Sequence, residues 1–316
     1  MPSDDRVRFE KPDLNLLRNE YTVVDLHFHS HYSDGLNCVS KIADRARKLG
    51  IGVAITDHND IRGALEIARH EDVLSIPGIE LTSAEGSHLL VYFYEFEQLE
   101  RFFENEVAPF RGMGIMSSLA LPMDELIARA RQYHSVIIFP HPFCAMYTGV
   151  CNLHFSEGQR HYLFSQVDGV EVINANLLSK WNLKCTVLGF NLRKTMVGGS
   201  DGHALSHMGR AVSYARCRAT RHDFLDALRA RSNRVVGKEI PLLRKMTSNS
   251  LKFRNNLCIC NEMFEKNLRY GCKAINIKSK AIRSNIQRRL GAYFQQHPEK
   301  LQPETGPLPL TVTHRR

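Results

Sequence analysis

The sequence predicts an α/β fold in which strands and helices alternate along the chain. Between about residues 22 and 231, short runs rich in Val and Ile alternate with longer segments of helical periodicity. The chain has 316 residues, and one α/β barrel uses about 250 residues, so the length fits one barrel plus an appendage. No apolar run approaches the ~18 residues of a membrane span. These observations favour βα units and a mostly parallel sheet.

Each apolar run is long enough for one strand, and a helix-like segment usually follows it. The predicted strands cover residues 22–27, 52–56, 74–79, 88–94, 136–139, 170–173 and 196–199. The predicted helices cover residues 39–49, 61–69, 97–106, 123–133, 157–166, 179–190 and 221–230. In the helix over 123–133, Pro122 precedes the first turn, and Leu126, Ile127 and Ala130 form an apolar face. Residues 109–121 lack periodicity, and we expect a long loop near the mouth of the site.

The alternation stops after Gly237, and this change divides the chain. We expect an N-terminal segment at 1–21, a barrel domain at 22–240 and a mainly helical basic extension at 241–316. Within the extension we expect a helix over 276–294 and a disordered end over 298–316. The extension holds 15 Lys and Arg against 4 Asp and Glu, which leaves 27 against 29 in the first 240 residues. This asymmetry fits either contact with a polyanion or a solvated basic helix.

The cysteines and the N-terminus indicate a compartment. The eight cysteines are scattered and form no Cys-x-x-Cys pair, so we expect reduced thiols. The first 13 residues are polar and carry charges of both signs, unlike a secretory signal. We therefore expect a cytoplasmic protein without a membrane partner.

The segment 23–35 carries the first candidate metal ligands. An apolar run ends in His27 and His29, and Asp34 follows in a turn marked by Ser33 and Gly35. Residues at i and i+2 of a strand share a face, so the two imidazoles can reach one metal ion. Alone, this pattern is a weak signal, because two histidines on a strand are often only surface residues.

Donor groups of the same kind recur at the ends of other predicted strands. Together the candidates are His27, His29, Asp34, His58, Glu80, His88, His141, Asp201 and His203. The carboxyl ends of parallel strands lie on one face of a barrel, so these nine side chains can converge. A lone buried histidine is more often hydrogen-bonded structure than a ligand. Burying several imidazoles with three carboxylates, however, is costly unless cations neutralise them. We therefore predict a metal cluster.

The motifs around these residues occur together and in a fixed order. They are Asp25-x-His27-x-His29-Ser30, Ser33-Asp34-Gly35, Thr56-Asp57-His58, Gly78-x-Glu80, His141-Pro142 and Ser200-Asp201-x-His203. Over residues 22–240 the chain resembles the PHP (polymerase and histidinol phosphatase) family. It is most similar to the small bacterial members that hydrolyse phosphate from nucleotides or short oligonucleotides. The resemblance implies a distorted, TIM-like (β/α)7 barrel with two or three divalent metal ions.

The resemblance also implies how the ligands are divided. The first metal would be held by His27, His29, Glu80 and Asp201. Glu80 would bridge to a second metal, completed by His88 and His141. The third metal would be held by Asp34, His58 and His203. The residues of the catalytic centre would be His27, His29, Glu80, Asp201 and His203. This mixture of imidazoles and carboxylates suits Mn²⁺, Zn²⁺ or Fe²⁺ better than Mg²⁺.

Two metal ions at about 3.5–4 Å can lower the pKa of a bridging water and create a metal-bound hydroxide. Motifs for acyl transfer or for nucleotide-triphosphate motors are not found in the sequence. We therefore predict a metal-dependent phosphoesterase that acts on nucleotides or short oligonucleotide ends. Two alternatives stay open. One is a phosphatase of a small metabolite such as histidinol phosphate, and the other is a non-catalytic nucleic-acid-binding protein that uses its basic tail.

Two arginines are candidates for holding a substrate phosphate. Arg210 follows the last motif closely, and a guanidinium can bind phosphate through two hydrogen bonds. The alternative is a surface arginine that starts the next strand. Arg62, after His58, carries a weaker signal of the same kind. We expect Glu171 to make internal hydrogen bonds, and His31 to lie near the site without binding metal.

Overall fold

Ten strands in the described part of the chain form two five-stranded sheets. In this computed structural model, the described residues are 5–112, 114, 117–144, 148–241 and the single positions 268, 272, 279 and 287. The first sheet has the order β1-β10-β9-β2-β3, and the second has the order β4-β5-β6-β7-β8. The strands are β1 (Val7–Arg8), β2 (Thr22–Phe28), β3 (Gly52–Ile55), β4 (Gly78–Thr82), β5 (His88–Phe93), β6 (Ser135–Phe139), β7 (Gly169–Asn174), β8 (Thr195–Gly199), β9 (Ala211–Ala215) and β10 (Arg234–Gly237).

Isolated bridges join segments of the two sheets at two places. Phe28 pairs with Gly202, which links β2 to the segment after β8. His58 pairs with Glu80, and Val53 pairs with Ser75, which link β3 and its continuation to β4. The fold is therefore mixed α/β with two sheets, and the closed seven-stranded barrel stays a prediction.

The expectation of a mostly parallel sheet is wrong for part of the molecule. β2 and β3 are parallel, as are β6, β7 and β8, but β5 runs antiparallel to both β4 and β6. The connection from β4 to β5 is a tight turn in which the Ser83 N–H donates to Ser87 O at 2.9 Å. So short a connection can join only antiparallel strands. As a result β5 begins where β4 ends, and His88 pairs directly with Thr82.

Other differences concern strand positions. The strand predicted over 74–79 is β4, which begins only at Gly78. Pro77 interrupts the predicted strand, because proline has no N–H to donate, and Ser75 before it makes only an isolated bridge with Val53. The short strands β1, β9 and β10 were not predicted. The predicted extension beyond residue 241, with its helix over 276–294 and its end over 298–316, lies outside the described residues except for the four single positions.

Every predicted helix from 39 to 230 is present, the helices over 39–49 and 157–166 with the predicted bounds and the others with shifted ends. The helical elements are α1 (Leu14–Leu17), α2 (Val39–Leu49), α3 (Arg62–Ile67), α4 (Phe96–Phe102), η1 (Phe103–Val107), η2 (Ala108–Phe110), α5 (Met123–Ala130), α6 (Glu157–Gln166), α7 (Ser179–Leu192) and α8 (Arg221–Arg229). α2 ends at Gly50, whose φ of 66° is the left-handed conformation that closes many helices. α6 begins with a capping box of Ser156 and Gln159. Among the described residues, no helix has both the length and the apolar character to cross a membrane.

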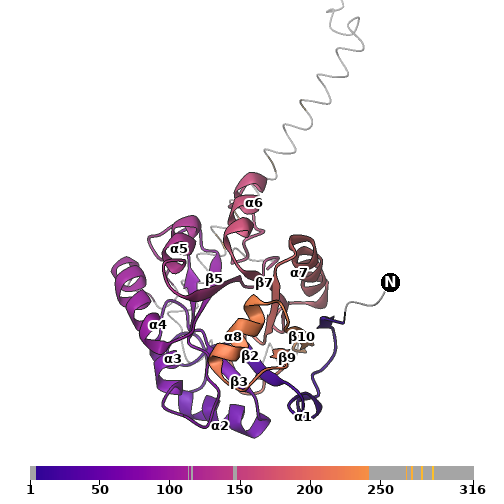
Figure 1. The fold of residues 1–316 in the computed structure, drawn as a ribbon. Helices are drawn as coiled ribbons and strands as arrows, with labels where there is room; N and C mark the ends of the chain where they lie inside the picture. The colour runs from indigo at the N-terminus through magenta and orange to yellow at the C-terminus, as the bar shows by residue number, and fades with distance from the viewer. Residues whose placement is uncertain are drawn as a thin grey trace, which may run out of the picture. The chain divides into compact units, whose positions relative to one another are not determined.

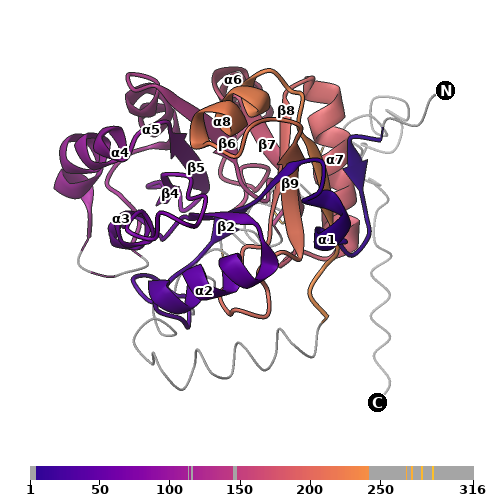
Figure 2. The ribbon, with the colours of Figure 1, turned by 60° about the horizontal axis from the view of Figure 1, so that its bottom comes forward.

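The strands enclose an apolar interior that is closed at one end by a helix. Alternate residues of β5, such as Leu90 and Tyr92, face this interior, whereas Leu89 and Val91 pack outward. Phe224 and Leu228 of α8 join the inner cluster, and α8 lies across the strands in Figure 1. Figure 2 shows α3, α4 and α5 on one side of the strands and α7 on the other. The opposite end of the interior is left for polar side chains.

Candidate metal centre

All nine predicted ligands gather in one cluster at that opposite end. They come from the end of β2, from the middle of β4, from the first residue of β5, and from the segments that follow β2, β3, β6 and β8. Eight of them are buried, and Asp201 is half-buried. The structure therefore brings together side chains that are up to 176 positions apart in the sequence, from His27 to His203.

Glu80 is the centre of this arrangement. Its Oε1 lies 2.8 Å from Nδ1 of His88 and 3.3 Å from Nε2 of His141. Its Oε2 lies 3.2 Å from Nδ1 of His58, 3.3 Å from Nε2 of His27 and 3.4 Å from Nε2 of His29. One carboxylate thus faces five imidazoles, as a group shared between metal sites would.

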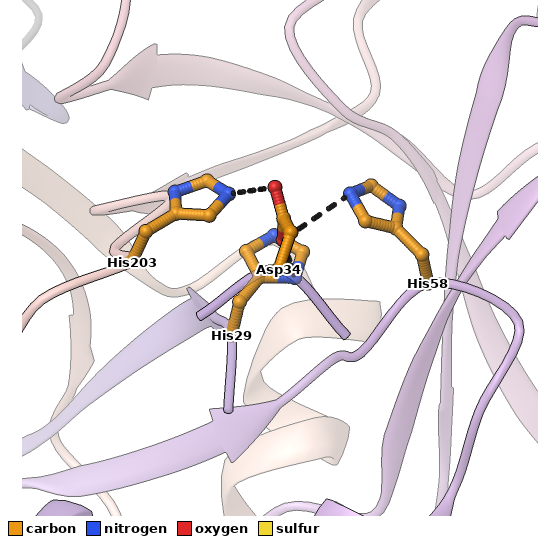
Figure 3. A group of neighbouring side chains, drawn as sticks. All are labelled: His29, Asp34, His58 and His203. Carbon is orange, nitrogen blue, oxygen red and sulfur yellow. Dashed lines mark ion pairs between the residues drawn. The ribbon is translucent and has the colours of Figure 1, made fainter. Parts of the chain in front are cut away.

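A second carboxylate, Asp34, lies among three imidazoles, two of which also face Glu80. Figure 3 shows His29, His58 and His203 arranged around it. Nε2 of His203 lies 2.9 Å from Asp34 Oδ2, and His29 and His58 each approach Asp34 Oδ1 to 3.8 Å. Asp201 lies on the other side, with its Oδ1 3.3 Å from Nε2 of His29 and 3.7 Å from Nε2 of His27.

An irregularity in β2 aims its two histidines at the centre. Val24 and Leu26 face the interior, and strict alternation would place Phe28 there as well. The pairing of β2 with β3 shifts register between Asp25 and Phe28, and Phe28 packs in the outer cluster instead. Such a bulge changes the face on which the following side chains lie. His27 and His29 therefore point inward.

The sequence interpretation missed two of three buried carboxylates that support the ligands. Glu171 lies 3.0 Å from Nδ1 of His27 and accepts the His141 N–H at 2.9 Å, which confirms its expected internal hydrogen bonds. Asp57 accepts the Ser30 N–H at 2.8 Å, and Asp25 accepts the Ser200 N–H at 2.8 Å. Asp25 and Glu171 interrupt apolar strand sequences, and this is the signal that could have revealed Asp25; Asp57 follows the end of β3 in a polar segment.

The polar atoms of the cluster fit bound cations. In the described part of the chain, several buried donor atoms make no hydrogen bond: Nε2 of His27, both ring nitrogens of His29, Nδ1 of His58 and Oε2 of Glu80. Buried polar atoms normally make hydrogen bonds, so atoms without one are suited to bind a cation instead. Three groups have ligand atoms within 4.8 Å of one another: His29, Asp34, His58 and His203; His27, His29 and Asp201; and His58, Glu80 and His88.

These groups differ from the predicted division: Glu80 is not grouped with His27, and His141 is in none of the three groups. His29 belongs to two groups, because its Nδ1 faces Asp34 while its Nε2 faces Asp201. His58 stands beside Glu80 and His88 as well as beside Asp34. His58 thus lies between the two predicted sites that were expected to be separate.

The electrostatics of the cluster follow from burial and from the mixture of charges. Burial alone would raise the pKa of Glu80, but His88, His27 and His58 hold it well below its usual value. Burial opposes the charged form of His27, but Glu80, Glu171 and Asp201 raise its pKa well above the usual value. For His58, burial wins and lowers the pKa to about 3. His58 is therefore a neutral imidazole with a lone pair to donate.

The two candidate arginines lie in different surroundings. Arg62 is held by Asp60, with its Nη2 2.8 Å from Oδ2. Arg210 is half-buried and precedes β9, which runs antiparallel to β2, so it lies near the end of β2 that carries the ligands. His31 is exposed, and its ring contacts Tyr32 at 4.2 Å. Asn174 and Asn176 both donate to Asp201, at 3.2 Å to Oδ2 and 3.0 Å to the main-chain oxygen.

Comparisons with known proteins agree with this geometry. The family model described as PHP domain matches residues 25–141, and the model described as PHP-associated matches residues 191–233. An uncharacterised protein of Methanocaldococcus jannaschii, MJ1587, is 30% identical over 166 residues, which are 48% of this chain and 81% of that protein.

Two solved structures share the fold. One is a two-domain protein from Bacteroides vulgatus containing a predicted PHP-like metal-dependent phosphoesterase, with a TM-score of 0.53, 18% identity, and coverage of 75% of this chain and 70% of that one. The other is the lesion-specific endonuclease PfuEndoQ from Pyrococcus furiosus, with a TM-score of 0.55, 18% identity, and coverage of 68% of this chain and 57% of that one. With the family models and the archaeal relative, these findings assign the chain to the PHP family of metal-dependent phosphoesterases.

Proposed function

We propose that this protein hydrolyses phosphate esters of nucleotides or of short oligonucleotide ends. The observation that carries the proposal is the convergence of six imidazoles and three carboxylates, with buried donor atoms that lack hydrogen bonds. Two or three ions of Mn²⁺, Zn²⁺ or Fe²⁺ fit this donor set. When bound, such ions would supply a Lewis acid that activates water and neutralises phosphoryl charge.

The nine side chains would share the ions around Glu80 and Asp34. We assign His27, His29 and Asp201 with Glu80 to one ion, and His88 and His141 with Glu80 to another. We assign Asp34, His58 and His203 to a third ion, with His29 close enough to contribute. Of these side chains, Asp201 and His203 are the most exposed, at 17% and 10%. They would therefore lie nearest to the substrate.

The neighbouring residues would keep this arrangement rigid. Asn174 and Asn176 hold Asp201 through the two hydrogen bonds described above. Asp201 itself has a left-handed φ of 48°, a strained conformation for a non-glycine residue that these contacts maintain. Rigid placement of the carboxylate would fix the position of a phosphoryl group relative to the ligands.

Several features support a nucleotide or nucleic acid substrate. A structural neighbour was solved as endonuclease Q in complex with a duplex that contains an abasic lesion. The excess of basic over acidic residues after position 240 favours a polyanionic partner. We propose Arg210 and Arg62 as phosphate contacts on this basis. In this proposal, β2 to β8 are the seven strands of a distorted barrel.

The test is a phosphate-release assay after loading with Mn²⁺, Zn²⁺ or Fe²⁺, together with elemental analysis of the purified protein. The substrates are a nucleoside 3′,5′-bisphosphate, a 5′-phosphorylated oligonucleotide and histidinol phosphate. We expect chelator-sensitive release from the first two, and a loss of at least about a hundredfold in His27→Ala. His161→Ala, an exposed histidine on α6, is the matched control.

Two results would contradict the proposal. Turnover of histidinol phosphate alone would identify a metabolite phosphatase instead. Salt-sensitive nucleic acid binding that survives His27→Ala, without chelator-sensitive hydrolysis, would identify a binding protein.

A further inference from the structure

Beside the metal centre, one buried carboxylate holds two arginines. Asp60 is 2% exposed. Its Oδ1 accepts Nε–H of Arg62 at 3.0 Å, and its Oδ2 accepts Nη2–H of Arg62 at 2.8 Å. Nη2 of Arg111 reaches the same Oδ2 at 3.4 Å. Two guanidinium groups from separate segments therefore converge on one carboxylate.

This cluster is joined to two segments that carry predicted metal ligands. Asp60 is two residues after His58, and the guanidinium of Arg62 lies 4.7 Å from the centre of the Tyr32 ring. Tyr32 is two residues before Asp34, and its hydroxyl donates to Glu66 at 2.8 Å. Arg62 is thus held at its edge by Asp60 and on its face by a ring from the loop that carries Asp34.

The second arginine comes from a loop that is itself anchored to the centre. Arg111 precedes the segment that returns to the end of β4, where the Leu119 N–H donates to Thr82 O at 2.8 Å. The side-chain nitrogen of Asn59, next to His58, donates to Ser117 O at 2.9 Å. These bonds place Ser117 and Leu119 beside Asn59 and Thr82, which follow His58 by one residue and Glu80 by two.

The guanidinium of Arg62 has N–H groups that do not donate to Asp60. A guanidinium has five N–H groups. In the described part of the chain, Asp60 is the only hydrogen-bond acceptor of the Arg62 guanidinium and uses its Nε–H and one Nη2–H. The Arg62 side chain is 61% exposed and that of Arg111 is 31% exposed, whereas Asp60 is hidden. The negative charge is therefore inside, and two positive charges face outward.

We propose that Arg62 and Arg111, positioned by Asp60, form a subsite for a second phosphate group of the substrate. This inference rests on the proposed function and narrows its substrate class to molecules with two phosphates, or with a phosphodiester next to the cleaved ester. Planar guanidinium groups fixed by a carboxylate match a tetrahedral phosphate through paired hydrogen bonds. Asp60 acts through the arginines and is a positioning residue.

The experiment compares one substrate with a second phosphate and one without it. Adenosine 3′,5′-bisphosphate and p-nitrophenyl phosphate are assayed with the metal-loaded protein and with Arg62→Gln, Arg111→Gln and Asp60→Asn. We expect each variant to raise KM for the bisphosphate by about 10- to 100-fold, with little change in kcat. Hydrolysis of p-nitrophenyl phosphate, which has no second phosphate, should lose at least about tenfold less than hydrolysis of the bisphosphate in each variant.

Two further variants sharpen the result. Arg62→Lys retains the charge but not the paired geometry, so it should recover only part of the bisphosphate KM. Arg47→Gln is the control. It removes an arginine of α2 that pairs with Asp72 and Asp44, and it should leave the hydrolysis of both substrates unchanged. Equal losses on both substrates, or no loss on either, would overturn the subsite.

Failure of the proposed function gives a different result. In that case the metal-loaded wild type hydrolyses neither substrate, and binding measured by calorimetry decides the subsite. Adenosine 3′,5′-bisphosphate should then bind at least about tenfold tighter than adenosine 5′-monophosphate, and Arg62→Gln should remove this difference. Equal binding of the two nucleotides would refute the arginine subsite independently.

Discussion

At the scale of single residues, the buried carboxylates beside the metal centre determine how its ligands are presented. Glu171 accepts hydrogen bonds from three directions: His27 Nδ1–H, the His141 N–H and the side-chain amide of Asn174. Because Nδ1 of His27 is engaged, its Nε2 is left to face Glu80 and Asp201. Carboxylates in this position fix the ring orientation and the tautomer of a ligating histidine.

Glu171→Gln tests this role. An amide has one acceptor oxygen and a donor NH₂, so it cannot accept from His27 and His141 at once without placing a donor against a donor. We expect affinity for Zn²⁺ to fall by about 10- to 100-fold while the protein still folds. Competition with a chromophoric chelator measures the affinity. Glu125→Gln, which affects a half-exposed surface pair with Arg129, is the control. Unchanged affinity in Glu171→Gln would remove Glu171 from the centre.

At the scale of elements, close contact between β8 and β2 places His27 beside the end of β8. A Cβ at Gly199 would lie 2.4 Å from Cβ of His27 and 2.8 Å from its main-chain nitrogen. Only a glycine fits here, because both neighbouring atoms are close to the backbone and cannot move away. The last residue of β8 therefore helps to set the position of the first ligand.

Gly199→Ala should destabilise the protein by about 1–3 kcal/mol through overpacking and should also displace His27. Urea unfolding measures the loss of stability, and Zn²⁺ competition measures the loss of affinity. Gly158→Ala is the matched control, because a Cβ there meets nothing within 4 Å in the first turn of α6. In the control we expect no loss and a gain of up to about 0.5–1 kcal/mol. A loss in both variants would mean that the β2–β8 contact is not the cause.

At the scale of the whole molecule, the buried imidazoles and carboxylates of the metal centre couple metal binding to pH. Burial opposes the charged forms of His29 and His141, but carboxylates raise the pKa of both. Burial lowers the pKa of His88. In the absence of cations, protons therefore occupy part of the cluster. Ligation needs the neutral imidazole, so metal and protons compete for the same nitrogens.

Metal binding should consequently release protons. Because the raised pKa values favour protonated His27, His29 and His141, lowering the pH should weaken metal binding, and raising it should strengthen binding. Calorimetric titration with Zn²⁺ in two buffers of different ionisation enthalpy measures the number of protons released. Bound metal should also raise Tm, and a chelator should reverse this. Binding that is independent of pH, with no proton release, would contradict this account of the cluster.

The sequence by itself indicated the nine candidate donor side chains, because each lies at the end of an apolar run or in the polar segment beside it, and all except His88 belong to an ordered set of motifs. It also determined the alternation of strands and helices, because periodicity is a local property. The reversed direction of β5 was not predicted, since it depends on a tight turn rather than on the composition of the strand. The strand predicted over 74–79 is present as β4 but begins only at Gly78, after Pro77, which has no N–H to donate.

Only the tertiary structure decided which groups face one another. The register shift in β2 reverses the side on which His27 and His29 lie, and no pattern in that strand marks it. The pairing of Asp60 with both Arg62 and Arg111 joins segments about 50 residues apart, and the sequence shows these charges only as separate residues. The sequence shows which residues can act as ligands, because this depends only on the chemistry of each side chain. Which ligands share a site, and which carboxylate holds which arginine, depends on distances that only the packing of the fold sets.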